Sequence, residues 1–284
     1  MAETCQMAWA IALAVALFSQ PTVAAPTIGG CSFDPATRNF AGTVEQQSIC
    51  LLRKVKPKGS GATAQSVPTW LLQRIDHPIT LTVAQVQAYL DRNRISSADV
   101  GGALAMGDTP VRRYFVIHDT SWPELPDAPS FPTDIDLPDH PSNRLTGWDG
   151  ISNKVNLIIS RDGRSRTFQD WSTARPSSAT KLEVRTNASR EAFVHVENIQ
   201  VRMKPPGSWA WRAPEPGLGS AQEQRLALAY VVASLRAGRW LIPAYHFNID
   251  QGLPDGHDDP QNADLASWVA RLQSIEKEIG ERAP

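Results

Sequence analysis

The sequence has no excess of charge of either sign and no apolar run of membrane-spanning length. Its 28 basic and 29 acidic residues nearly cancel over 284 residues, so bulk charge does not predict binding to nucleic acid or to an anionic membrane surface. The apolar run from Met7 to Phe18 is too short to span a bilayer. We therefore expect no nucleic-acid partner and no membrane span.

The same apolar run has the length of a signal-peptide core. The small-residue segment TVAAPT follows it, as expected of a cleavage site. We assign residues 1–25 to a signal peptide and expect a periplasmic or secreted mature protein. A buried helix is the alternative interpretation of this run.

Cysteine is scarce, with three residues in the chain. Cys5 would leave with the signal peptide, and Cys31 and Cys50 would remain as an even pair in an oxidising compartment. A disulfide between them would contribute about 3 kcal/mol by the chain-entropy estimate. Zinc binding by this pair is the less favoured alternative, because it forms no CxxC motif and has no histidine nearby.

An N-terminal extension is predicted over residues 26–104. Residues 26–66 are rich in Gly, Ser, Thr and Lys and have little periodicity, which predicts a tethered, loop-like segment. Thr82 and Gln85 then have the spacing of a capping box, and apolar residues recur near the helical period after them. We expect a helix at about residues 83–94.

Short β-branched and aromatic runs alternate with helical patterns from residue 105 onwards, which predicts a layered α/β domain over residues 105–284. Ser220 and Glu223 form a capping box for the longer helix, and Gly238 is placed to end it. The expected strands are 111–118, 155–160, 192–201 and 240–247, and the expected helices are 220–238 and 264–279.

Two connections in this domain carry turn and loop signals. The Pro- and Asp-rich stretch between Ser121 and Trp148 is unsuited to a regular element and should form a surface loop. The Arg161-Asp162-Gly163 turn follows the second strand and is typical of a hairpin, with no role in a site.

Two of the six histidines, His118 and His246, come at the ends of predicted strands, where side chains emerge into loops that often build sites. A lone histidine is more often a hydrogen-bonded structural residue, but the segment after His246 is rich in further ligand types. Catalytic zinc sites use three protein ligands and leave one position open, and two histidines with one carboxylate are an accepted set. Residue types alone leave the third ligand open among Asp250, Asp255, His257, Asp258 and Asp259.

The order of the motifs YFVIHDT, NLIISRDG, FVHVEN, IPAYHF and GHDDP resembles the zinc-dependent N-acetylmuramoyl-L-alanine amidases of the amidase-2 family. These enzymes share their fold with peptidoglycan recognition proteins. The resemblance covers roughly residues 110–270. It implies a central mixed β-sheet flanked by helices, a Zn²⁺ cofactor, and peptidoglycan or a muropeptide as partner. It does not imply an oligomeric state.

The resemblance also implies a role for individual residues. The zinc ligands would be His118, His246 and Asp259, the last because a proline follows it, with His257 and Asp258 as alternatives for the third position. Glu197, in the VHVE sequence, matches the glutamate that serves as general base. His257 stands where the family often has an oxyanion-stabilising lysine and could donate the same hydrogen bond.

The chain departs from the family at two further places. Val155 and Asn156 replace a common His-Tyr pair, and no WHAG sequence occurs between Thr167 and Thr186. The expected activity is hydrolysis of the amide between N-acetylmuramic acid and L-alanine. A non-catalytic peptidoglycan-binding module and a zinc peptidase of other specificity remain the alternatives.

Overall fold

A computed structural model of the chain describes residues 29–57 and 61–281, and within these it does not describe the side chains of residues 187–189. The predicted signal peptide, residues 1–25, lies outside the described residues. None of the described helices is both long and apolar enough to cross a membrane.

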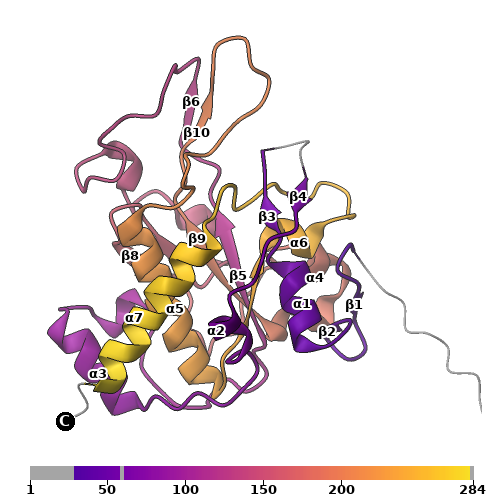
Figure 1. The fold of residues 1–284 in the computed structure, drawn as a ribbon, viewed down its shortest axis with the longest axis vertical. Coiled ribbons are helices and arrows are strands. Elements are labelled where there is room, and N and C mark those ends of the chain that lie inside the picture. Colours follow the sequence, from indigo (N-terminus) through magenta and orange to yellow (C-terminus); the bar gives the residue numbers. More distant parts are fainter. Residues whose placement is uncertain (1–28, 58–60, 282–284) are drawn as a thin grey trace, which may run out of the picture.

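The centre of the molecule is a five-stranded mixed β-sheet, which confirms the predicted α/β class (Figure 1). The first four strands in the sheet order run parallel to their neighbours, and the last pairs antiparallel. Strand β5 is buried along its whole length, as expected of a parallel strand covered on both faces. The order is β11 (Ile242–Tyr245), β5 (Tyr114–Asp119), β9 (Phe193–Asn198), β7 (Leu157–Ile159) and β8 (Ser165–Thr167).

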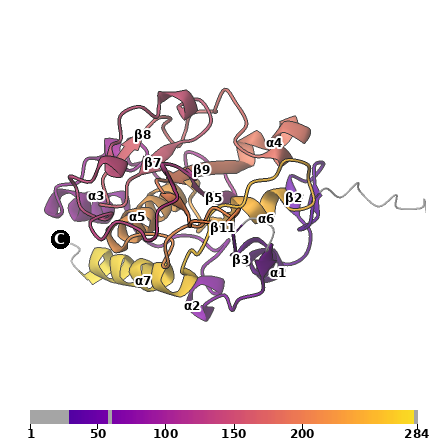
Figure 2. The same ribbon diagram turned by 90° about the horizontal axis from the view of Figure 1, so that it is seen from above.

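Helices flank this sheet. Helix α5 (Ser220–Ala237) contacts β7, β9 and α7 (Leu265–Glu281), and α3 (Val83–Arg92) contacts α7 in turn. Because α5 lies between the sheet and another helix, it is buried on almost every face. Figures 1 and 2 show α1 (Val44–Leu51), α4 (Lys181–Arg185) and α6 (His246–Asp250) grouped together, apart from α5 and α7.

The prediction of a loop-like segment over residues 26–66 is wrong for its described part. Phe33, Phe40 and Leu51 are buried in the same core as β5 and β9, and rings of Phe33 and Phe40 contact Phe193. Cys31 and Cys50 form the expected disulfide across this region. Its elements are too short to show a period in the sequence: β1 (Phe33–Asp34), β2 (Asn39–Phe40), α1, β3 (Lys54–Val55) and β4 (Ala62–Thr63). Another short helix, α2 (Thr69–Leu72), follows the segment.

The helix predicted at residues 83–94 is confirmed, with Thr82 and Gln85 making the capping box. The predicted box at Ser220 is wrong, because α5 is capped at Gly219, whose N–H donates to the Gln222 side chain. Gly238 does end that helix in the left-handed region, at φ 75°.

The region between Ser121 and Trp148 is not wholly irregular. Strand β6 (Glu124–Pro126) pairs in parallel with β10 (Arg202–Lys204), so the third predicted strand ends earlier than expected and a separate strand follows it. The turn at residues 161–163 joins β7 and β8 as the predicted hairpin. Four 3₁₀ segments complete the described structure: Ser97–Asp99, Pro141–Asn143, Asp149–Ile151 and Asn187–Ala192.

Candidate metal centre

Two neighbouring parallel strands bring His118 and His246 together. Ile117 of β5 pairs with Tyr245 of β11, so the next residue in each chain segment is one of the two histidines. His118 still belongs to β5, whereas His246 is the first residue of α6 and not the end of a strand as predicted. Carboxyl ends of adjacent parallel strands meet at one edge of a sheet, which is where open α/β proteins commonly bind ligands.

Asp259, on the loop before α7, completes a buried cluster with these histidines. The Nδ1 atoms of His118 and His246 lie 2.9 Å apart, and His246 Nδ1 lies 3.0 Å from Asp259 Oδ1. His118 Nδ1 lies 3.6 Å from Asp259 Oδ2. Zinc bonds of about 2.0–2.1 Å in a tetrahedral site place ligand atoms about 3.3 Å apart, so the three groups have the spacing and chemistry to hold a metal ion.

The alternative third ligands Asp250, His257 and Asp258 lie outside the three-residue cluster. Asp250 accepts a hydrogen bond from His246 Nε2, on the far side of the ring from the cluster. Asp258 accepts from the Gln261 side chain, and His257 Nδ1 lies 4.0 Å from Asp259 Oδ1. His257 is 62% exposed and lies beside the cluster, with its ring centroid 5.0 Å from that of His246.

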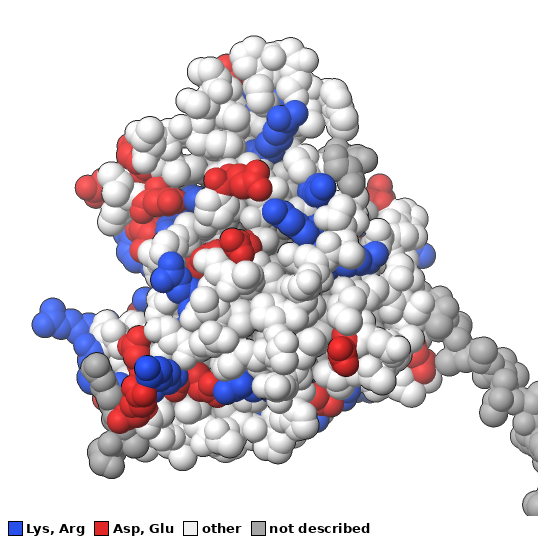
Figure 3. Space-filling model, viewed as in Figure 1, with Lys and Arg blue, Asp and Glu red and all other residues white. Residues whose placement is uncertain are grey.

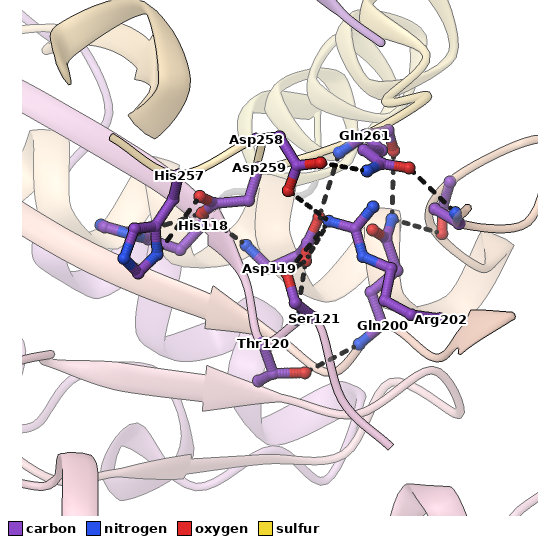
Figure 4. A network of polar contacts seen from close by, with 12 residues as sticks. His118, Asp119, Thr120, Ser121, Gln200, Arg202, His257, Asp258, Asp259 and Gln261 are labelled. Atoms are coloured by element: carbon purple, nitrogen blue, oxygen red, sulfur yellow. Dashed lines mark hydrogen bonds and ion pairs between the residues drawn. The ribbon is translucent and has the colours of Figure 1, made fainter. Parts of the chain in front are cut away.

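A hydrogen-bond network fixes the loop that carries Asp259 (Figure 4). The Asp119 N–H donates to Asp259 Oδ2 at 3.2 Å, and the Gln261 N–H donates to Asp119 Oδ2 at 3.0 Å. Arg202 donates to both oxygens of Asp119 and is buried with it. Asp119 therefore joins β5 to the chain on either side of Pro260, through its backbone N–H to Asp259 and its carboxylate to Gln261, and positions the third candidate ligand.

Glu197 of β9 lies next to the cluster because it pairs with His118 across the sheet. Its Oε1 lies 4.0 Å from His118 Nδ1, and its Oε2 is buried without a hydrogen-bond partner among the described residues. Burial, followed by the charges of Asp259 and Asp119, raises the pKa of Glu197 well above its ordinary value. A carboxyl group with a raised pKa beside residues that could hold a metal ion is suited to accepting and returning a proton.

The charges within the cluster favour a protonated His246 beside an ionised Asp259 in the metal-free protein. Burial and the neighbouring His246 lower the pKa of His118 to about 4. Burial also disfavours charge on His246, but the carboxylates of Asp259 and Asp250 outweigh it and hold the pKa of His246 well above its ordinary value. The same pairing holds the pKa of Asp259 well below its ordinary value despite burial. A metal ion would have to displace the proton on His246.

A second buried chain of contacts, which the sequence did not predict, lies behind His118. His118 Nε2 lies 2.7 Å from His195 Nδ1, and His195 Nε2 lies 3.3 Å from Glu183 Oε2. Glu183 also accepts from Arg175 at 2.6 Å. Burial and the nearby guanidinium of Arg175 lower the pKa of His195 well below its ordinary value, so this ring is neutral.

The cluster opens into a pocket of about 270 Å³. Glu197 and His257 line it together with the three clustered residues, and Trp148 and Lys154 form part of its wall. Across the face of the molecule in Figure 3, basic and acidic side chains are interspersed, in keeping with the balanced composition. The site is therefore recognised by its pocket and by the three clustered residues, and not by an excess of surface charge of one sign.

No family model, no curated protein and no solved structure matches the chain. The fold and the site therefore define the class: an α/β protein with a central mixed sheet and a buried His118–His246–Asp259 cluster that could hold a metal ion.

Proposed function

We propose that this protein is a zinc-dependent N-acetylmuramoyl-L-alanine amidase with an amidase-2-like fold. The observation that carries the proposal is the convergence of His118, His246 and Asp259 in a pocket that Glu197 also lines. The resemblance of the sequence motifs to the amidase-2 family implies the roles of these four residues. Two histidines and a carboxylate form a donor set of the catalytic zinc type.

The residues around the cluster fit an amide hydrolysis. A zinc ion, when bound, supplies a Lewis acid for the amide carbonyl and makes water reactive near neutral pH. Glu197, with its raised pKa, would take a proton from the attacking water and return it to the leaving amine. The exposed His257 would donate a hydrogen bond to the developing oxyanion from the pocket rim.

The Cys31–Cys50 disulfide supports an oxidising location, and peptidoglycan lies outside the cytoplasmic membrane. We propose a periplasmic or secreted protein on this basis. The predicted signal peptide supports the same location.

The test is to incubate the purified protein with muropeptides and to analyse the products by mass spectrometry. An amidase releases an intact stem peptide with a free L-alanine amino terminus, and a chelator should abolish this release. His118→Ala should lose both bound zinc and turnover, whereas Asp258→Asn, which changes a neighbouring carboxylate outside the cluster, should retain the metal.

Other products decide between the remaining functions. Cleavage within the stem peptide would support a zinc peptidase and contradict the amidase proposal. Binding of muropeptide without any released product would support a non-catalytic module. A His118→Ala variant with stoichiometric zinc and full turnover would show that the cluster is not the site.

A further inference from the structure

Both histidines of the cluster are held from behind by carboxylates that meet at one short helix, α4. Asp250, the last residue of α6, accepts from His246 Nε2 at 2.8 Å. The same carboxylate accepts from the backbone N–H groups of Lys181 and Leu182, at 2.9 and 3.0 Å. Asp250 therefore joins the first turn of α4 to the outer nitrogen of one candidate ligand.

The second carboxylate, Glu183, belongs to α4 itself. It reaches His118 through His195, by the contacts of 3.3 and 2.7 Å described above. It also accepts from the N–H of Thr180 at 3.0 Å and from the Thr180 hydroxyl at 3.1 Å, as the N3 residue of a capping box. Glu183 thus takes part both in the capping box of α4 and in the contact with His195.

These contacts orient both rings the same way. Ionised carboxylates only accept hydrogen bonds, so Asp250 requires an N–H at His246 Nε2. The His195 Nε2–Glu183 Oε2 contact of 3.3 Å lacks hydrogen-bond geometry, but a carboxylate at this distance still favours an N–H at His195 Nε2 over a lone pair. His195 Nδ1 can then only accept, which places an N–H at His118 Nε2. In a neutral ring, each outer N–H leaves the Nδ1 lone pair for a metal, and the two Nδ1 atoms are those that face the cluster.

A helix of five residues has little stability of its own, because nucleation is costly and few internal hydrogen bonds repay it. The order of α4 therefore depends on contacts outside its own turns. These include its capping box, the buried Leu182 and the carboxylates of Asp250 and Glu183. Contacts of Asp250 and Glu183 therefore contribute both to the order of α4 and to the orientation of the two rings.

We propose that α4 is a positioning element for the metal centre, which orients His118 and His246 through Glu183 and Asp250 so that metal binding and the order of α4 are coupled. The proposal rests on the metal-binding part of the proposed function, and not on its substrate. Coupling of this kind is reciprocal, so a metal ion stabilises α4 and a defect in α4 weakens metal binding.

The first test uses the wild-type protein and needs no substitution. Hydrogen exchange of the backbone amides of residues 181–186 is measured by mass spectrometry with a chelator and with saturating Zn²⁺. Exchange in α4 should slow on zinc binding by more than that in α3, which contacts neither the cluster nor its carboxylates. Equal exchange in α4 with and without bound zinc would overturn the proposal.

The second test uses zinc affinity, measured by chelator competition without any substrate. Asp250→Asn should weaken zinc binding about 10- to 100-fold, as other losses behind a metal ligand do. Thr180→Val removes only the capping hydroxyl, touches no ligand, and should still weaken zinc binding several-fold. Val184→Ala, on the exposed face of α4, is the matched control and should bind zinc like the wild type.

The visible spectrum of the Co²⁺-substituted protein separates positioning from general destabilisation, because it reports ligand geometry. It should change in Asp250→Asn and stay unchanged in Val184→Ala. Wild-type zinc affinity in Thr180→Val would overturn the proposal. Coupled zinc binding in a protein that cuts no muropeptide would overturn only the amidase proposal, whereas a wild-type protein that binds no zinc would overturn both.

Discussion

Replacing Glu197 with glutamine should stabilise the metal-free protein at neutral pH, although it removes the proposed general base. The Glu197 side chain is 15% exposed, its Oε2 has no hydrogen-bond partner among the described residues, and burial, followed by the charges of Asp259 and Asp119, raises its pKa. Glutamine has nearly the same shape and carries no charge at any pH. Only the wild-type protein therefore loses stability because folding disfavours the charged form of this group.

The cost can be bounded from the direction of the shift. A glutamate in the unfolded chain titrates near pH 4.3, and folding raises the pKa of Glu197, so stability falls as the pH rises from that value towards the folded one. At pH 7 the interval is about 2.7 pH units at about 1.4 kcal/mol each, so the loss is no more than about 4 kcal/mol.

The assay is urea unfolding of wild type and Glu197→Gln at several pH values between 4 and 7.5, with a chelator present. The difference in unfolding free energy should be near zero at pH 4 and should grow in favour of the variant as the pH rises. Saturating Zn²⁺ should shrink it, because a nearby cation favours the carboxylate. An exposed control, Glu124→Gln, should change stability by no more than about 0.5 kcal/mol at any pH. A difference that is independent of pH would refute the reasoning.

Two further predictions concern the disulfide and the pocket rim. Cys31→Ser with Cys50→Ser should lower the unfolding free energy by about 3 kcal/mol, because the bridge closes a loop of 19 residues. A reductant should lower the unfolding free energy of the wild type equally, and equal unfolding midpoints in urea would contradict this prediction. His257→Ala should bind zinc normally but, if the amidase proposal holds, turn over muropeptide about 10²- to 10³-fold more slowly, with His257→Lys restoring much of the rate; full turnover by His257→Ala would remove His257 from the mechanism.

Elements with a long local pattern could be predicted from the sequence. A capping box and a helical period predict the helix at residues 83–92, and the apolar run YFVI predicts a strand. The pairing of β6 with β10 could not be predicted, because strands of three residues have no measurable period. The prediction for residues 26–66 was wrong for the same reason, because the elements there are also short. The burial of this segment also depends on contacts with residues more than a hundred positions away, such as Phe193.

The candidate ligands were predictable only in part. The sequence places His118 and His246 at the ends of predicted strands, and the register of β5 with β11 brings the two histidines together, although His246 begins α6. The spacing of His246 and Asp250, four residues apart, can be read from the sequence. It does not predict which ring nitrogen of His246 the carboxylate contacts. His195 shares the alternation of β9 with Glu197, which was a usable signal, but its contact with Glu183 depends on tertiary structure alone.

The N-terminal segment also contributes to the position of His246, although it supplies no candidate ligand. His246 begins α6, a helix of five residues that depends on tertiary contacts for its order. The Asn248 side chain, within that helix, donates to the backbone carbonyls of Leu51 and Arg53, at 2.9 and 2.8 Å. Since α4 holds the end of α6 through Asp250, the helix that presents His246 is fixed on both sides. The segment ending at Arg53 is therefore part of the support of the metal centre.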